Sequence, residues 1–122
     1  MHLNTAGLVA ATAVGVGRSL TGAYFLARPA AGSQAWVGST SSAARYLTAA
    51  VGGRDLAIGA GVLWSVATGN SPTPWVVASV AGDTCDAALA TRMFDGPQRK
   101  RAVLAAGGFG VLGAGAIALL LA

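Results

Sequence analysis

The sequence predicts an all-α protein, built as one bundle of four transmembrane helices. Three observations lead to this fold class. Only 10% of the 122 residues are charged, the mean hydropathy is +0.62, and four apolar segments reach the length of about 20 residues that a membrane-spanning helix needs. A water-soluble domain carries about 25% charged residues, so this chain has too few polar side chains to cover a water-facing surface. We therefore expect a single membrane domain over residues 1–122.

Turn residues divide the chain into the expected spans, which cover about residues 5–27, 44–68, 74–94 and 101–122. Pro29 ends the first span, because proline disfavours helix at the residue before it. The turn cluster Gly-Asn-Ser-Pro at residues 69–72 ends the second span. Pro74 opens the third span, since proline is tolerated in a first helical turn. The pair Gly96-Pro97 is expected to break the chain before the fourth span.

The connection between the first two spans, residues 28–45, is rich in alanine, glycine and serine. We predict a plain linker here. The alternative is a short piece at Trp36 and Val37 that dips into the headgroup region, where aromatic rings are favoured.

Loop cations predict the orientation in the membrane. Six of them flank the first and third connections and none flanks the second; they are Arg28, Arg45, Arg92, Arg99, Lys100 and Arg101. Cytoplasmic loops carry the excess of lysine and arginine, so we expect a multi-pass protein of the inner (plasma) membrane with both termini outside the cytoplasm. Trp64 and Trp75 then lie at the outer interface. The inner interface receives Tyr24, Tyr46 and Phe94, at the depth where amphipathic rings settle.

Glycine is frequent inside the expected spans, and the whole chain has 18 glycines. We expect most of them to let helix backbones approach closely, as small residues do in membrane bundles. The fourth span carries a row of small residues at four-residue spacing, Ala106, Gly110, Ala114 and Ala118. This row suits packing within the bundle or against a second copy in a homodimer.

Five charged residues fall inside the expected spans, where a charge costs about 2.5–3.5 kcal/mol on insertion scales. They are Arg18 in the first span, Arg54 and Asp55 in the second, and Asp83 and Asp86 in the third. With a rise of about 1.5 Å per residue, the topology places all five in a slab roughly 8 Å thick. We therefore expect them to face the interior and to meet in a single charge layer.

The geometry of the charge layer can be predicted in part. Asp83 and Asp86 are three residues apart and share a helix face. Arg54 and Asp55 are adjacent, about 100° apart around the helix, so we expect them to line one surface without aiming at one point. The layer has three carboxylates for two guanidinium groups. One carboxylate is therefore expected to lack a partner, and one to hold a proton at neutral pH, because close carboxylates do not both ionise readily in a low dielectric.

A protonated carboxyl group beside an arginine-bound carboxylate forms an acid–base pair. The catalytic candidates are Asp83 and Asp86 as acid and base, Asp55 as the alternative base, and Arg54 and Arg18 as groups that orient and tune them. The expected substrate is lipophilic, an isoprenoid or another lipid. The expected reaction is epoxide opening by hydrolysis or cyclisation, or an isomerisation. Such Asp–Arg–Asp sets resemble those of limonene-type epoxide hydrolases in chemistry, not in fold.

Two other functions stay open at this point. In the second interpretation, the charged side chains hold the helices of this chain together or bind a partner protein, as in an accessory or structural membrane subunit. A small proton-coupled transporter is the third interpretation. It requires a dimer, because four short helices enclose little space for alternating access.

Several classes of site lack the residues that they need. No cluster of histidine and cysteine suits zinc or haem, so we expect no metal and no cofactor. The only histidine, His2, is terminal and expected to be solvated. No phosphate-binding loop and no Ser-His-Asp set is present. The net charge is +4, but no basic surface with interleaved aromatic residues accompanies it, so nucleic acid is not an expected partner.

Two motifs carry a resemblance to a known family. Residues 53–59 read Gly-Arg-Asp-Leu-Ala-Ile-Gly, and after Trp75 residues 82–90 read Gly-Asp-Thr-Cys-Asp-Ala-Ala-Leu-Ala. In these features the chain resembles the DUF4267 family of small four-helix integral membrane proteins, which is similar in layout to DoxX-like proteins. The resemblance covers most of the chain and implies four helices, with Arg-Asp in the second and Asp-x-x-Asp in the third. It implies no mechanism, because the function of that family is unknown.

Overall fold

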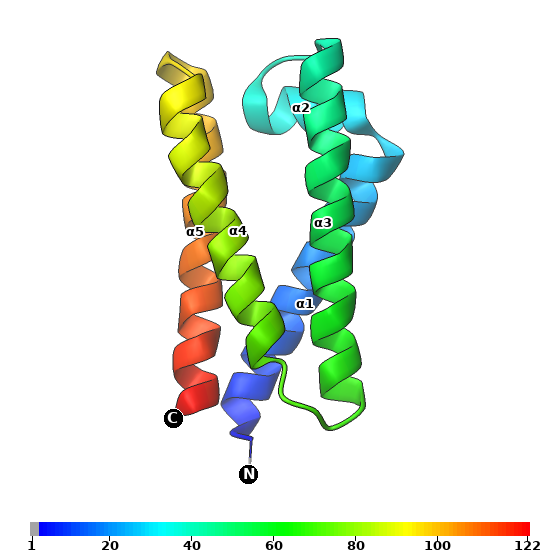
Figure 1. Cartoon of the computed structure of the whole chain (residues 1–122), viewed down its shortest axis with the longest axis vertical. Helices are drawn as coiled ribbons and strands as arrows, with labels where there is room; N and C mark the ends of the chain where they lie inside the picture. Colours follow the sequence, from blue (N-terminus) through cyan, green and yellow to red (C-terminus); the bar gives the residue numbers. More distant parts are fainter. Residues whose placement is uncertain (1–2) are drawn as a thin grey trace.

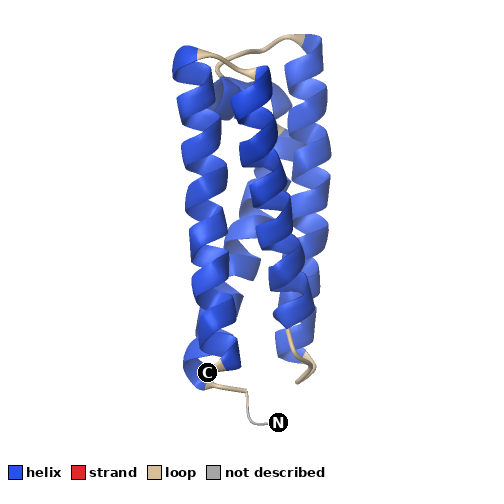
Figure 2. Cartoon of the chain, turned by 60° about the vertical axis from the view of Figure 1, so that its left-hand side comes forward, coloured by secondary structure: helices blue, strands red, loops and turns tan. Residues whose placement is uncertain are grey.

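A computed structural model describes residues 3–122, which form five α-helices and contain no strand (Figure 1; Figure 2). The helices are α1 (Thr5–Ala27), α2 (Pro29–Val37), α3 (Ser42–Ala67), α4 (Thr73–Met93) and α5 (Gly96–Leu121). The predicted all-α fold class is therefore confirmed. The prediction for His2 lies outside the described residues.

The four long helices form an elongated bundle with both chain ends at one end of it (Figure 1). The turn between α3 and α4 lies at this same end, whereas α2 and the α4–α5 connection lie at the opposite end. The two most extensive helix–helix interfaces join α1 to α3 and α4 to α5. These two pairs meet mainly where α1 packs on α5.

Local chemistry sets several helix ends. The side chain of Asn4 accepts a hydrogen bond from the backbone N–H of Ala6 at 3.0 Å and begins α1. The hydroxyl of Ser41 does the same for the N–H of Ala44 at 3.1 Å and begins α3. Both residue types are favoured N-caps because they satisfy an otherwise unpaired N–H.

The plain linker predicted between the first two spans is wrong, because it contains α2. Pro29 occupies the first turn of this helix, where its missing N–H leaves no bond unmade. Gly38 ends the helix in the left-handed region, with φ of 70°. The connection therefore adds a short helical layer to the end of the bundle that lies away from the chain termini (Figure 1).

The predicted chain break lies next to Gly96, whose φ of 53° is not helical, but the predicted start of the fourth span near residue 101 is wrong. Gly96 and Pro97 lie in the first turn of α5, so this helix begins at Gly96. A proline is compatible with the first turn of a helix, as at Pro74 in α4. The interruption between α4 and α5 is confined to Phe94 and Asp95.

Glycines bring the backbones of α1 and α3 into contact. A Cβ atom added to Gly22 would lie 2.5 Å from the backbone nitrogen of Leu56. A Cβ atom added to Gly59 would lie 2.7 Å from the backbone nitrogen of Ser19. Neither position admits a side chain unless a helix moves. The predicted role of the glycines in close helix packing is confirmed at this interface.

The row of small residues on α5 packs within the bundle only in part, and its alternative role in a homodimer stays a prediction. Ala106 is buried and Gly110 is half-buried, but Ala114 and Ala118 are exposed. A row at four-residue spacing drifts around a helix by about 40° per step, so it leaves the interface. The buried residues of α5 follow spacings of three, four and seven instead; they are Ala102, Ala106, Gly113, Ala116 and Leu120.

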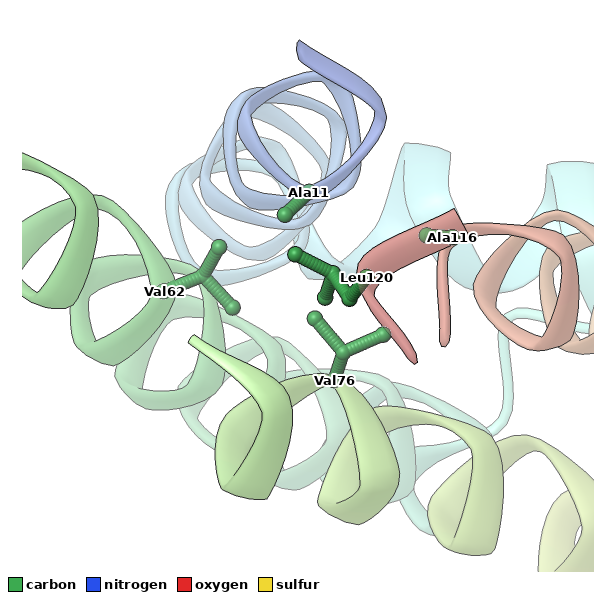
Figure 3. Packing of buried hydrophobic residues seen from close by; sticks show 5 residues of the cluster. All are labelled: Ala11, Val62, Val76, Ala116 and Leu120. Carbon is green, nitrogen blue, oxygen red and sulfur yellow. The ribbon is translucent and has the colours of Figure 1, made fainter. Parts of the chain in front are cut away.

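An apolar core holds the four long helices together at the end of the bundle where the chain termini lie. Its buried side chains point toward one another from all four long helices (Figure 3); they are Ala11, Val62, Val76, Ala116 and Leu120. The short helix α2 lies at the opposite end of the bundle (Figure 1). The middle part of the bundle therefore separates α2 from this core.

Among the described helices, α5 is the one that is long and apolar enough to cross a bilayer by length and composition. The other three long helices each carry one or two of the five charged residues within their length. Charged residues lower the hydropathy of a segment, which accounts for the difference. The arrangement of four membrane spans is taken up as a proposal below.

Candidate functional site

The helix faces that build the apolar core also carry buried charges. In each of α1, α3 and α4, a charged residue lies seven positions along the chain from a core residue. The pairs are Ala11 and Arg18, Val62 and Asp55, and Val76 and Asp83. Seven residues make about two helical turns, so each charge points to the same side as the core residue of its helix. The exposed fractions of the three residues are 3%, 4% and 3%.

Arg18 bridges two carboxylates from different helices. Its Nη1 donates to Oδ1 of Asp55 at 2.9 Å, and its Nη2 donates to Oδ2 of Asp83. Nη2 also donates to the backbone carbonyl oxygen of Ser79 at 3.4 Å. The guanidinium carbon lies 5.5 Å from the centre of the Phe109 ring, a cation–π distance. One side chain of α1 therefore contacts α3, α4 and α5.

Arg54 forms a second bridge. Its Nη1 and Nη2 donate to Oδ1 and Oδ2 of Asp86 at 2.9 and 2.7 Å, a bidentate pair. Its Nη2 and Nε also donate to Oδ1 of Asp55 at 3.1 and 3.3 Å. Asp55 therefore receives hydrogen bonds from both arginines. The side chain of Arg54 is 31% exposed, against 4% for Arg18.

The five charged residues form one chain of ion pairs, in the order Asp83, Arg18, Asp55, Arg54, Asp86. The prediction that charges from three helices meet in a single layer is confirmed. We refer to these five residues as the charge layer.

Two finer predictions about the charge layer are wrong. Arg54 and Asp55 were expected not to aim at one point, yet they are hydrogen-bonded, because the long arginine side chain reaches back to its neighbour. One carboxylate was expected to lack a partner. Among the described residues each of the three has an arginine, because each arginine binds two carboxylates. That one carboxyl group holds a proton stays a prediction.

A cavity of about 50 Å³ adjoins the charge layer. Its lining includes Arg18 and all three carboxylates of the layer, together with the aromatic rings of Phe25, Trp36 and Phe109. A water molecule needs about 10–15 Å³ of such space, whereas pockets for drug-sized ligands have about 300–1,000 Å³. The cavity therefore has room for water or a small polar group, and not for a large lipophilic molecule.

The charge layer has unused hydrogen-bonding capacity. Within residues 3–122, the buried Nε of Arg18 and the buried Oγ of Ser79 have no hydrogen-bond partner. The hydrogen bonds to Asp55 and Asp83 engage Oδ1 and Oδ2 respectively. The second oxygen of each carboxylate receives no hydrogen bond from the described residues. Buried polar groups are nearly always hydrogen-bonded, so water in the cavity is the simplest partner for the unpaired atoms.

Sequence reasoning missed the aromatic side of the cavity. Trp36 was considered only as an interfacial ring, but its Nε1 donates to Oγ1 of Thr48 at 2.9 Å, and it stacks on Phe25 with 6.0 Å between ring centres. The signal available in the sequence was a tryptophan within a segment of otherwise small and polar residues. Nothing in the spacing of Phe25 or Phe109 indicated that they line a cavity.

No protein-family model, no curated protein and no solved structure matches this chain. The resemblance to the DUF4267 family therefore stays a prediction. The described residues contain no group of three or more histidine, cysteine, aspartate or glutamate side chains arranged to hold a metal ion. The chemistry of the site has to be inferred from the charge layer and its cavity.

Proposed function

We propose that all four long helices cross the bilayer. Supporting this, three of the five residues of the charge layer are buried and the other two are half-buried. Large apolar side chains are exposed on every long helix, for example Leu20, Trp64, Leu89 and Val111. This distribution suits a lipid environment, in which apolar side chains face outward and intramembrane charges face the bundle interior and pair. Helices also satisfy their own backbone hydrogen bonds, as the bilayer core requires. The four-helix layout that the DUF4267 resemblance implies agrees with this proposal.

The proposed orientation has both chain termini outside the cytoplasm, at the inner (plasma) membrane. Apart from Arg18 and Arg54, the arginines and lysines lie in or next to α2 and the α4–α5 connection, at the end of the bundle away from the termini. The turn between α3 and α4 carries none. The end that is rich in cations is expected in the cytoplasm.

We expect alkaline phosphatase fused after Ala122 to be active in bacterial cells, because this enzyme matures only outside the cytoplasm. A green fluorescent protein fused at the same position should be dark. The same two reporters inserted after Ser39, in the α2–α3 connection, serve as the control and should give the opposite pattern. A fluorescent fusion at Ala122 would contradict the orientation.

We further propose that the charge layer is the acid–base site of a cofactor-independent membrane enzyme, which opens the epoxide ring of a lipophilic substrate with water. The observation that carries this proposal is the bridge from Arg18 to Asp55 and Asp83 at the wall of a cavity of about 50 Å³. One guanidinium group holds two carboxyl groups from different helices, and each keeps one oxygen free. With three carboxylates and two arginines, the layer has one negative charge in excess, which a proton neutralises.

In the proposed reaction, Asp83 is the acid and carries its proton on Oδ1, the oxygen that Arg18 does not bind. This proton passes to the epoxide oxygen as its bond to carbon breaks. Oδ2 of Asp55 takes a proton from a water molecule, and the oxygen of that water forms the new bond to carbon. The product is a vicinal diol, and transfer of the proton from Asp55 to Asp83 through water restores the starting state.

The contacts distinguish the roles of the three carboxyl groups. Asp55 is bound by two arginines and is assigned as the carboxylate, whereas Asp83 is bound by Arg18 alone and is assigned as the proton carrier. Both oxygens of Asp86 are engaged by Arg54. We therefore assign Asp86 and Arg54 as positioning residues that hold Asp55 in place. Hydrolysis is preferred to cyclisation or isomerisation because the cavity has room for water beside the carboxyl groups.

We expect Asp83→Asn and Asp55→Asn each to lower diol formation at least about 10²-fold, since removal of a general acid or base has an effect of this size. Asparagine keeps the shape of the side chain but neither donates a carboxyl proton nor accepts one. Diol formation from butylene oxide, which is small enough for the cavity of about 50 Å³, would be measured in liposomes in ¹⁸O-labelled water, with one labelled oxygen expected per product.

The matched control for these variants is Asp95→Asn. Asp95 is the remaining aspartate of the chain and lies outside the charge layer, in an exposed pair with Arg99. Its replacement should leave diol formation unchanged. Equal rates for Asp83→Asn and the wild-type protein, or no diol from any lipophilic epoxide, would reject the enzymatic proposal.

One observation favours a second function, that of an accessory or structural membrane subunit. Every carboxylate in the layer is bound by an arginine, as expected of charges that join helices. In that case the same asparagine variants lower thermal stability or the recovery of a complex without changing any chemistry. Mass spectrometry of what co-purifies in mild detergent separates the two functions, since it reveals either a bound lipophilic molecule or a protein partner.

A further inference from the structure

Trp36 lines the cavity on the side of α2. It is the one residue of α2 in the cavity lining, and the other lining residues belong to the four long helices. Those helices are fixed by the close α1–α3 backbone contacts at Gly22 and Gly59 and by the ion pairs of the charge layer. Replacement of the indole ring therefore leaves the contacts that fix the four long helices in place.

The position of the Trp36 ring is well defined. Its Nε1–H is bound by Thr48, whose hydroxyl donates to the backbone carbonyl oxygen of Ala44 at 2.8 Å. One face of the ring stacks on Phe25, with 26° between the ring planes. A Cβ atom added to Gly32 of α2 would lie 2.8 Å from the Phe25 ring, so α2 packs closely against this aromatic pair. A ring held in this way defines the size of the space behind it.

We propose that Trp36 is a specificity-determining residue, which limits the substrate to short-chain aliphatic epoxides. This inference rests on the proposed function and adds the substrate class. The epoxide oxygen and the attacking water must lie at the charge layer, and a carbon chain that extends from there toward α2 within this cavity meets the indole ring. The volume of this cavity is about 50 Å³. Pockets that take larger lipophilic ligands have volumes of about 300–1,000 Å³.

We expect Trp36→Ala to extend the range of substrates toward longer chains. The measurement is kcat/KM for butylene oxide and for dodecene oxide, and the ratio of the second to the first should rise at least about tenfold. Trp36→Phe keeps an aromatic ring on Phe25 and should shift the ratio less, in the same direction. This second variant also preserves the test if the alanine variant does not fold.

The control is Trp64→Ala, which removes a tryptophan that is 70% exposed and outside the cavity lining. It should leave the ratio at the wild-type value. A ratio that stays unchanged in both Trp36 variants would overturn the assignment.

A binding experiment separates this inference from the proposed hydrolysis. Butanediol and dodecanediol, the products of the two substrates, are titrated calorimetrically into wild-type protein and Trp36→Ala in nanodiscs. A tenfold or larger shift in relative Kd toward dodecanediol, without any turnover of epoxide, supports the role of Trp36 and rejects the hydrolase. Turnover with unchanged specificity and binding rejects the role of Trp36 alone. Absence of both turnover and a shift in binding rejects both proposals.

Discussion

Arg18→Met is expected to lower the free energy of unfolding by about 3–5 kcal/mol, as removal of one partner from a buried ion pair does. Arg18 is 3% exposed and holds both Asp55 and Asp83. Methionine fills a similar volume but leaves two buried carboxyl groups without their shared cation. Asp55 keeps Arg54, whereas Asp83 has no second arginine within the described residues. Thermal unfolding in detergent, followed by circular dichroism, measures the effect.

Two further arginine variants set the scale for this prediction. Arg54→Met should have a smaller effect, because Arg54 and its partner Asp86 are more exposed, with side-chain values of 31% and 16%. Arg28→Met removes an exposed cation outside the charge layer and should change stability by less than about 0.5 kcal/mol. If Arg18→Met is no more harmful than Arg28→Met, the charge layer does not hold the bundle together.

A compensating substitution tests the physical reason for the loss. In Arg18→Met, the additional change Asp83→Asn removes the carboxyl group that has lost its only arginine. The double variant should therefore be more stable than Arg18→Met alone, as expected for two residues that interact directly. If the two destabilising effects simply add, the loss comes from packing and not from the buried carboxyl group that is left without a partner.

The depth of the charge layer was predictable because a helix advances by a constant rise per residue. Once the direction of each helix was inferred, Arg18, Asp55 and Asp83 had to fall at a similar level. The structure shows a further regularity, the seven-residue offset of each charge from the core residue Ala11, Val62 or Val76. That offset places charge and core on the same helix face, but it can be recognised only once the core residues are known.

The pairing within the layer was not predictable to the same degree. An arginine side chain is long and has several donors, so it can reach back along its own helix or across to another. The angle between neighbouring positions therefore did not decide whether Arg54 contacts Asp55. The sharing of Asp55 by two arginines depends on how three helices pack, which the sequence pattern does not encode locally.

The errors in the connections have a common cause. Proline either ends a helix or occupies its first turn, and the neighbouring residues do not distinguish the two cases. Pro29 does both here, because it follows the end of α1 and begins α2. The composition of residues 29–37, mostly small, gave little sign of a helix that packs on Phe25 and Thr48 through Gly32. The aromatic side of the cavity was missed for the same reason.

Gly22→Val is expected to separate α1 from α3 and to prevent recovery of monodisperse, folded protein in detergent. A Cβ atom at this position would lie 2.5 Å from the backbone nitrogen of Leu56 and 2.6 Å from the carbonyl oxygen of Gly52. Backbone atoms inside a helix cannot rotate away as a side chain can, so α1 must shift as a whole. The loss should reach the upper part of the range for overpacked cores, about 3 kcal/mol or more.

The shift of α1 should also disturb the charge layer, because Arg18 lies one helical turn before Gly22 on the same helix. Gly17→Val is the matched control, since a Cβ atom there meets nothing within 4 Å. Gly17→Ala should even stabilise α1, by up to about 1 kcal/mol, because alanine has the higher helix propensity. Size-exclusion profiles and thermal unfolding in the same detergent compare the three variants. If Gly22→Val elutes and unfolds like Gly17→Val, the two helices do not pack backbone to backbone, and the geometry that places Arg18 between Asp55 and Asp83 is lost with that contact.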